Sequence, residues 1–141
     1  EMAGFKFRLE KVLHVREIQE EHARNEWALQ ERLAREERLK LARLKKEEQA
    51  VKDFGYRQPD VQLRQAMYSY LDVLGLRIEK QAKRVREQEE IAAQAKEAWL
   101  LARQETKKVT TLREQQYDAW VKDQLRKEQK ILDDMRSHLP S

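Results

Sequence analysis

The chain of 141 residues contains no cysteine, only three glycines and two prolines, and no long apolar run. Without cysteine, a disulfide framework and a thiolate metal site are excluded, and this suits a reducing compartment. No apolar run approaches the roughly 18 residues that a membrane span needs. The order of charged, apolar and small residues that marks a signal peptide is also missing, so we expect no such segment.

Catalytic and metal-binding patterns are missing as well. His14 and Glu17 lie one helical turn apart, but two ligands without a third make no metal site. The glycines Gly4, Gly55 and Gly75 are too far apart to form a phosphate-binding loop. The sequence therefore predicts that the protein is not an enzyme and binds no cofactor and no metal.

What remains is the composition of a long helix. Charged residues make up 40% of the chain and hydrophobic residues another 40%, which is typical of a coiled coil. The 30 Lys and Arg residues exceed the 26 Asp and Glu residues and give a net charge of +4. These charges are evenly spread, with 13 basic and 12 acidic residues before Phe54 and 17 and 14 from there on. Because no basic block stands alone, we predict no nucleic-acid partner.

A single break divides the chain. Between Asp53 and Asp60 the sequence reads DFGYRQPD, where a glycine and a proline fall close together. Gly55 can adopt a positive φ and Pro59 lacks a backbone donor, so one helix should end and another begin here, with Asp60 as its N-cap. We predict an all-α fold, a long two-helix antiparallel coiled-coil hairpin that forms a single domain over residues 1–141, with a helix over about 5–53, a turn over 54–59 and a helix over about 60–138.

Each predicted helix carries an apolar stripe with alternating spacings of three and four residues, as in a coiled-coil seam. Polar residues such as Glu37, Gln81 and Gln88 interrupt the stripes, so the seam should be soft in its middle. Trp99 lies in register and is expected to anchor the seam. The predicted apolar positions are Leu9, Leu13, Ala23, Trp27, Ala34, Leu41, Leu44 and Val51 in the first helix, and Leu71, Leu74, Ile78, Val85, Ala92, Ala95, Trp99, Ala102 and Val109 in the second.

The second predicted helix is longer than the first. Folding back from the turn brings Phe5 opposite about residue 108, so about thirty C-terminal residues should lack a partner in the hairpin. They nevertheless carry an apolar stripe, which we interpret as a partner-binding face, with self-association as the alternative. The candidate residues are Trp120, Val121, Leu125, Leu132 and Met135, and the stripe continues to Leu139 between the basic residues Lys122, Arg126, Lys127, Lys130 and Arg136.

Aromatic residues gather near the turn, at Phe54, Tyr56, Tyr68 and Tyr70. Residues two apart in a helix point about 200° apart, so Tyr68 and Tyr70 cannot both face the seam. We therefore expect one of these two tyrosines to be exposed.

Three stretches, in order around the one turn, resemble the flagellar export protein FliJ family over nearly the whole chain. They are FKFRLEKVL at residues 5–13, MYSYLDVLGLRI at 67–78 and EQKILDD at 128–134. The stalk proteins of virulence type III secretion systems share this architecture and are the near alternative. A purely structural coiled coil is the other alternative.

The resemblance implies a role rather than a reaction. It implies a stalk or adaptor of the flagellar type III export apparatus that promotes assembly and activity of the export ATPase ring and links it to the cytoplasmic domain of the export gate and to export chaperones. It also implies a cytoplasmic protein at the inner face of the cell membrane, associated with the membrane only through the apparatus. The family's gate-contact pattern, an aromatic residue and then a leucine one turn later, falls on Tyr70 and Leu74. The following positions, Arg77 and Gln81, depart from the small and imidazole residues of some relatives.

Overall fold

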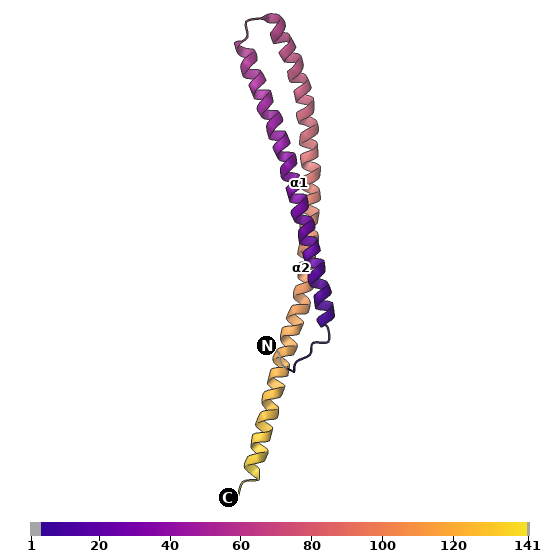
Figure 1. Cartoon of the computed structure of the whole chain (residues 1–141), viewed down its shortest axis with the longest axis vertical. Coiled ribbons are helices and arrows are strands. Elements are labelled where there is room, and N and C mark those ends of the chain that lie inside the picture. The colour runs from indigo at the N-terminus through magenta and orange to yellow at the C-terminus, as the bar shows by residue number, and fades with distance from the viewer. Residues whose placement is uncertain (1–3, 141) are drawn as a thin grey trace. The chain divides into compact units, whose positions relative to one another are not determined.

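The computed structural model describes residues 4–140 and contains two long helices. Helix α1 spans Glu10–Arg57 and helix α2 spans Val61–Ser137 (Figure 1). No strand occurs in the part of the chain that the structure describes. The prediction of an all-α fold with two long helices packed against each other is therefore confirmed. Residues 1–3 and 141 of the predicted domain lie outside the described residues.

The bounds of α1 differ from the predicted ones at both ends. The helix begins at Glu10 rather than near Phe5, because residues 5–9 are not helical. It continues past Asp53 to Arg57, so Gly55 lies inside it, and among the described glycines only Gly4 has a positive φ. The prediction that Gly55 ends the first helix was wrong. The stop comes from Pro59, which lacks an N–H and disfavours helical geometry in the residue before it.

Helix α2 begins where its N-cap was predicted. The Asp60 carboxylate oxygen Oδ1 accepts hydrogen bonds from the backbone N–H groups of Gln62 at 3.0 Å and Leu63 at 3.4 Å. These donors have no partner inside the helix, so the carboxylate satisfies them and fixes the first turn. The connection between the helices is thus only residues 58–60 rather than 54–59.

The chain packs as two compact units, which are described in turn. Of the described residues, one unit comprises residues 22–99, and the other comprises residues 4–21 together with residues 100–140. Each helix contributes to both units. The prediction of one coiled-coil domain over the whole chain stays a prediction.

In the unit of residues 22–99, α1 and α2 run antiparallel and are joined by the turn (Figure 1). The seam is narrow: Ala34, Leu74, Val85 and Ala92 are buried, and Leu74 is 0% exposed. The predicted seam residues of this unit are all buried or half-buried, so the predicted register is confirmed for Ala23, Trp27, Ala34, Leu41, Leu44, Val51, Leu71, Leu74, Ile78, Val85, Ala92, Ala95 and Trp99.

Two tryptophans meet across this seam. The rings of Trp27 and Trp99 stack with centroids 5.0 Å apart and planes 24° apart, and the Lys96 ammonium lies 5.7 Å from the Trp27 ring centroid. Stacked aromatic pairs contribute about 0.5–1.5 kcal/mol beyond the area they bury. Trp99 therefore anchors the seam, as the sequence predicted.

The polar interruptions of the seam pair with each other across it. The buried side chain of Gln81 donates from Nε2 to the backbone carbonyl and to the carboxylate of Glu37. Gln88 likewise donates from Nε2 to the backbone carbonyl of Gln30 at 3.3 Å and to the side-chain oxygen of Gln30 at 2.6 Å. The side-chain amides of Gln81 and Gln88 thus find their partners on the opposite helix, whereas the indole Nε1 of Trp27 is buried without a hydrogen bond to any described residue.

The pair of Glu37 and Gln81 predicts a pH dependence of stability. The hydrogen bond from Gln81, aided by Lys40, lowers the pKa of Glu37 from its ordinary value of 4.5. Because the pKa of Glu37 is lower in the folded chain than in the unfolded chain, the ionised carboxylate stabilises the fold at pH values above its unfolded-state pKa. This contribution is lost as the pH falls through the lowered pKa. Glu37→Gln should therefore lower the melting temperature near neutral pH and have a smaller effect at about pH 3. Thermal unfolding by circular dichroism measures this, and an equal difference at both pH values would contradict it.

Candidate functional site

The predicted site residues lie on helix faces. Among residues 4–140, no three or more His, Cys, Asp or Glu side chains gather in a way that could hold a metal ion. None of the helices in that range has the length and apolarity to cross a membrane. The surfaces that hold the predicted site residues are the C-terminal part of α2 and the part of α2 next to the turn.

The C-terminal overhang, defined as residues 125–140, is exposed along its whole length. Leu125 is 59% exposed, Leu132 52% and Met135 61%, and Leu139 continues the stripe. Burial of these side chains would be favourable by about 25 cal/mol per Å² of apolar area, and the prediction that the stripe is a partner-binding face stays a prediction. Three of the five predicted C-terminal site residues lie in this overhang.

The other two, Trp120 and Val121, are half-buried, and the N-terminal strap lies against Trp120. This strap, defined as residues 4–9, brings the Phe5 ring within 5.4 Å of the Tyr117 ring and 6.0 Å of the Trp120 ring, centroid to centroid. Gly4 has a φ of +82°, and a Cβ added to it would lie 3.4 Å from the Trp120 ring. Glycine at this position therefore allows the backbone to pass close to the indole.

The prediction that the chain beyond about residue 108 has no intramolecular partner is wrong up to Trp120, which the Phe5 ring contacts. It assumed that residues 5–9 continue the helix at about 1.5 Å per residue. Residues 5–7 are not helical and can cover up to about 3.3 Å each, about twice the rise of a helical residue, before the turn at Arg8 and Leu9 that leads into α1. The sequence did carry a signal, because the apolar residues Phe5 and Phe7 flank the exposed Lys6, an alternation that a single helix face does not give.

Polar contacts hold α1 against α2 next to the strap. The Arg113 guanidinium lies 3.1 Å from the Glu10 carboxylate, and the Thr106 hydroxyl donates to the Arg16 carbonyl at 3.2 Å. Leu13, which lies between Glu10 and Arg16 in the sequence, is buried, and Phe7 of the strap is buried as well. This unit therefore has its own small core around the start of α1.

The strap predicts a measurable change in tryptophan environment. Phe5→Ala removes the ring that covers Trp120, so the tryptophan emission should shift to longer wavelength and the melting temperature should fall by a few degrees, about 1 kcal/mol for a lost aromatic contact. Phe54→Ala is the matched control, since Phe54 is exposed and lies in the other unit. An unchanged emission spectrum for Phe5→Ala would show that the strap does not cover Trp120 in solution.

Tyr70 and Leu74 occupy different environments. The Tyr70 hydroxyl donates a hydrogen bond to the Glu47 carboxylate, and this bond raises the pKa of Tyr70. The ring of Tyr70 is partly exposed, whereas Leu74 is fully buried in the seam and Gln81 is buried as well. Only Tyr70 of the predicted pair is therefore available to a partner. Tyr68 is exposed, as was expected of one of the two tyrosines, and Tyr70 reaches solvent as well.

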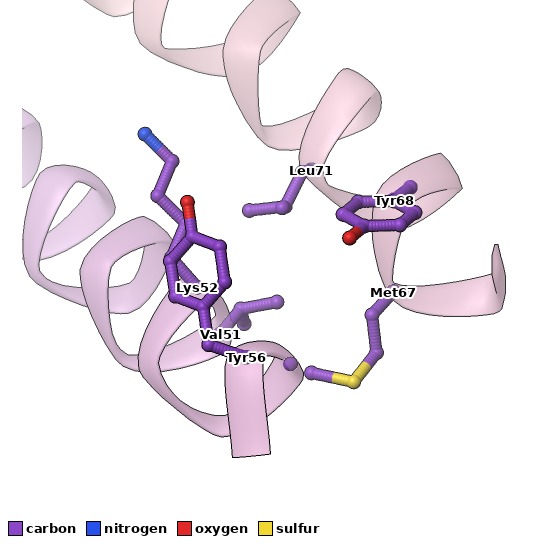
Figure 2. A pocket seen from close by; sticks show the side chains of 7 residues that line it. Val51, Lys52, Tyr56, Met67, Tyr68 and Leu71 are labelled. Carbon is purple, nitrogen blue, oxygen red and sulfur yellow. The ribbon is translucent and has the colours of Figure 1, made fainter. Parts of the chain in front are cut away.

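A hollow that no sequence pattern predicted lies beside the turn and is named the turn-end hollow. Figure 2 shows Tyr56 on α1 and Tyr68 on α2, with Met67 and Leu71 near them. The hollow is shallow, with a cavity volume of about 60 Å³. The sequence signal for the hollow was Gly55, a glycine that lies inside a helix. Its lining residues are Val51, Lys52, Gly55, Tyr56, Met67, Tyr68 and Leu71.

Together these features define a coiled-coil hairpin protein whose candidate functional surfaces are helix faces. The model of the flagellar FliJ protein family matches residues 5–141, so the chain belongs to this family. Among solved structures, the chain is similar to a YscO homologue, CT670 of Chlamydia trachomatis, with 21% sequence identity over 94% of this chain and 93% of that chain and a TM-score of 0.44. A comparison with curated proteins gives no match.

Proposed function

We propose that this protein is a stalk and adaptor of the flagellar type III export apparatus. It promotes assembly and activity of the export ATPase ring and links the ring to the cytoplasmic domain of the export gate and to export chaperones. Membership of the FliJ family supports this role. The protein then acts in the cytoplasm, at the inner face of the cell membrane, and reaches the membrane only through the apparatus.

The C-terminal overhang is the observation that carries the proposal. Its apolar stripe is exposed, and a partner that covers Leu125, Leu132 and Met135 gains their burial. Lys127 pairs with Asp123 at 3.2 Å, whereas Arg126 and Lys130 make no ion pair within the described residues. Basic side chains beside an apolar stripe can pair with carboxylates at the rim of the partner's surface and so fix the orientation of the helix. The overhang is thus proposed as the segment that contacts the ATPase ring.

The gate contact is proposed for the face of α2 that carries Tyr70. Its ring is partly exposed and its hydroxyl is held by Glu47, so the side chain is preorganised for a partner. Leu74 is assigned a supporting role, because its side chain lies in the seam and holds α2 in place under Tyr70.

The proposal is tested by measuring ATP hydrolysis by the cognate flagellar export ATPase with and without the full chain. We expect the chain to increase the rate and to co-purify with the ATPase and with the soluble domain of the gate. A folded chain that neither binds nor stimulates would overturn the proposal. Stimulation of a virulence-system ATPase instead of the flagellar one would assign the chain to the alternative apparatus.

A further inference from the structure

The charges of the unit of residues 22–99 are divided between two bands. The basic band, defined as residues 32–46 and 72–86, holds 12 Lys and Arg residues against 4 Asp and Glu residues, a net charge of +8. The acidic band, defined as residues 22–31 and 87–99, holds 6 Glu residues against 2 basic residues, a net charge of −4. Because the whole unit carries a net charge of only +3, the fold separates charges that are nearly balanced along the sequence.

The two bands meet at the same level on both helices. The basic band ends at Arg32 on α1 and at Arg86 on α2. The hydrogen-bonded pair of Gln30 and Gln88 lies two residues beyond that end on each helix. The antiparallel register therefore places two basic stretches, which are far apart in the sequence, beside each other, and it does the same for the two acidic stretches (Figure 1).

The positive charge of the basic band is not neutralised inside it. All 12 of its basic side chains are exposed. Arg38 pairs with Glu89 at 3.4 Å and Lys40 pairs with Glu37 at 3.3 Å. Eight others make no ion pair with any described residue: Arg32, Arg35, Arg43, Lys45, Lys46, Lys80, Lys83 and Arg86. The band therefore attracts negative charge from outside the molecule.

One exposed face of α2 crosses the boundary between the bands. Lys80, Lys83, Glu87 and Glu90 follow one another at spacings of three, four and three residues, so they lie on one side of the helix. All four side chains are exposed, whereas Val85 in the seam is buried. The face reads positive, positive, negative, negative along α2. A second copy that runs in the opposite direction presents the reverse order, so each lysine meets a glutamate.

We propose that this face of α2 docks a second copy of the chain, antiparallel and related to the first by a two-fold axis between Lys83 and Glu87. Lys80 then faces Glu90 of the second copy, and Lys83 faces Glu87 of the second copy. Each of these pairs occurs twice, because a two-fold contact uses the same surface on both copies.

The bands make a second copy the matching occupant. The acidic part of α2, residues 87–99, is about as long as the basic part, residues 72–86, and the axis lies close to where they meet. The basic band of each copy thus lies beside the acidic band of the other. Surface ion pairs are weak singly and are screened by salt, so the dimer is reversible and dissociates at high ionic strength. The contact uses neither the C-terminal overhang nor the turn-end hollow and does not depend on the export role.

Sedimentation velocity of the full chain tests this docking. At about 0.02 M salt, dimers should form as the protein concentration is raised, and at about 0.5 M salt the dissociation constant should be at least tenfold larger. The double variants Lys80→Glu, Lys83→Glu and Glu87→Lys, Glu90→Lys each give the face a single sign, so each should stay monomeric alone. An equimolar mixture of the two should associate again, since one face is then wholly negative and the other wholly positive.

Lys107→Glu, Lys108→Glu is the matched control, because it changes the net charge equally at exposed lysines outside both bands, and it should dimerise as the wild type does. Circular dichroism checks that every variant keeps its helix content. A wild-type chain that stays monomeric at millimolar concentration in low salt, a dimer that survives in either charge variant, or a mixture that stays monomeric would overturn the proposal. A dimer lost only in Leu125→Asp, Leu132→Asp would place self-association on the overhang instead.

A distance measurement tests the direction of the second copy without changing any charge. The chain has no cysteine, so a single spin label can be attached at Ala93→Cys or at Ser69→Cys, which are exposed positions of α2. With the axis midway between Lys83 and Glu87, the two labels of a dimer lie about 24 Å apart along the helix for Ala93 and about 48 Å apart for Ser69. Pulsed electron paramagnetic resonance at low salt should therefore give the longer distance for Ser69→Cys. Equal distances would indicate parallel copies and refute the two-fold docking.

Discussion

The double variant Leu125→Asp, Leu132→Asp is expected to stimulate the export ATPase at least tenfold less than the wild-type chain, at an unchanged melting temperature. Both leucines are more than half exposed and lie in a segment that is exposed along its whole length. In a complex, each new carboxylate would have to be desolvated against an apolar surface, at a cost of several kcal/mol if it is left unpaired. About 1.4 kcal/mol already lowers affinity tenfold, so the contact should be lost.

Leu101→Asp is the matched control for this double variant. Leu101 is another exposed leucine of α2, at 58%, but it lies outside the overhang. Val121 is a poorer position for the test, because it is half-buried next to the strap contact at Trp120, and a charge there could disturb the strap. Normal stimulation by the double variant, with a normal melting curve, would move the ring contact away from the overhang, to the strap or to the Tyr70 face.

Leu74→Ala is expected to destabilise the fold by about 2–5 kcal/mol, the usual cost of a cavity at a fully buried leucine. Tyr70→Phe removes only the hydroxyl that bonds Glu47 and should cost about 1 kcal/mol. Urea unfolding gives both values. Gate binding by Leu74→Ala, measured where the variant is folded, should then stay near that of the wild type. A wild-type unfolding curve together with lost gate binding would show instead that Leu74 contacts the gate directly.

The seam register could be predicted because it depends on local spacing alone. Positions three and four residues apart share one helix face, and the apolar residues on that face, from Ala23 to Val51 and from Leu71 to Trp99, are the ones that the structure buries. The polar positions Gln81 and Gln88 also lie in this face, and their partners follow from the antiparallel register.

The errors come from features that depend on tertiary contacts. Gly55 has the same identity whether it ends a helix or leaves room for a neighbour, and only Met67 on the opposite helix distinguishes the two cases. Residues 5–9 precede a long helix, but they are not helical, and Phe5 packs on Tyr117 and Trp120 instead of continuing α1. Leu74 fits a family contact pattern and a seam position equally well, and burial decides between them. Predictions about partners at these positions therefore needed the structure.

The two polar pairs of the seam also determine how the hairpin of residues 22–99 responds to shear. Glu37 with Gln81 and Gln30 with Gln88 are seven residues apart on each helix. Sliding one helix by seven residues brings Gln88 opposite Glu37, but it leaves Gln81 facing Leu44 and Gln30 facing Ala95. Any smaller slide separates both pairs at once, at the cost of their buried hydrogen bonds. The hairpin should therefore resist sliding up to a step of about 10 Å, the length of seven helical residues, rather than yield gradually.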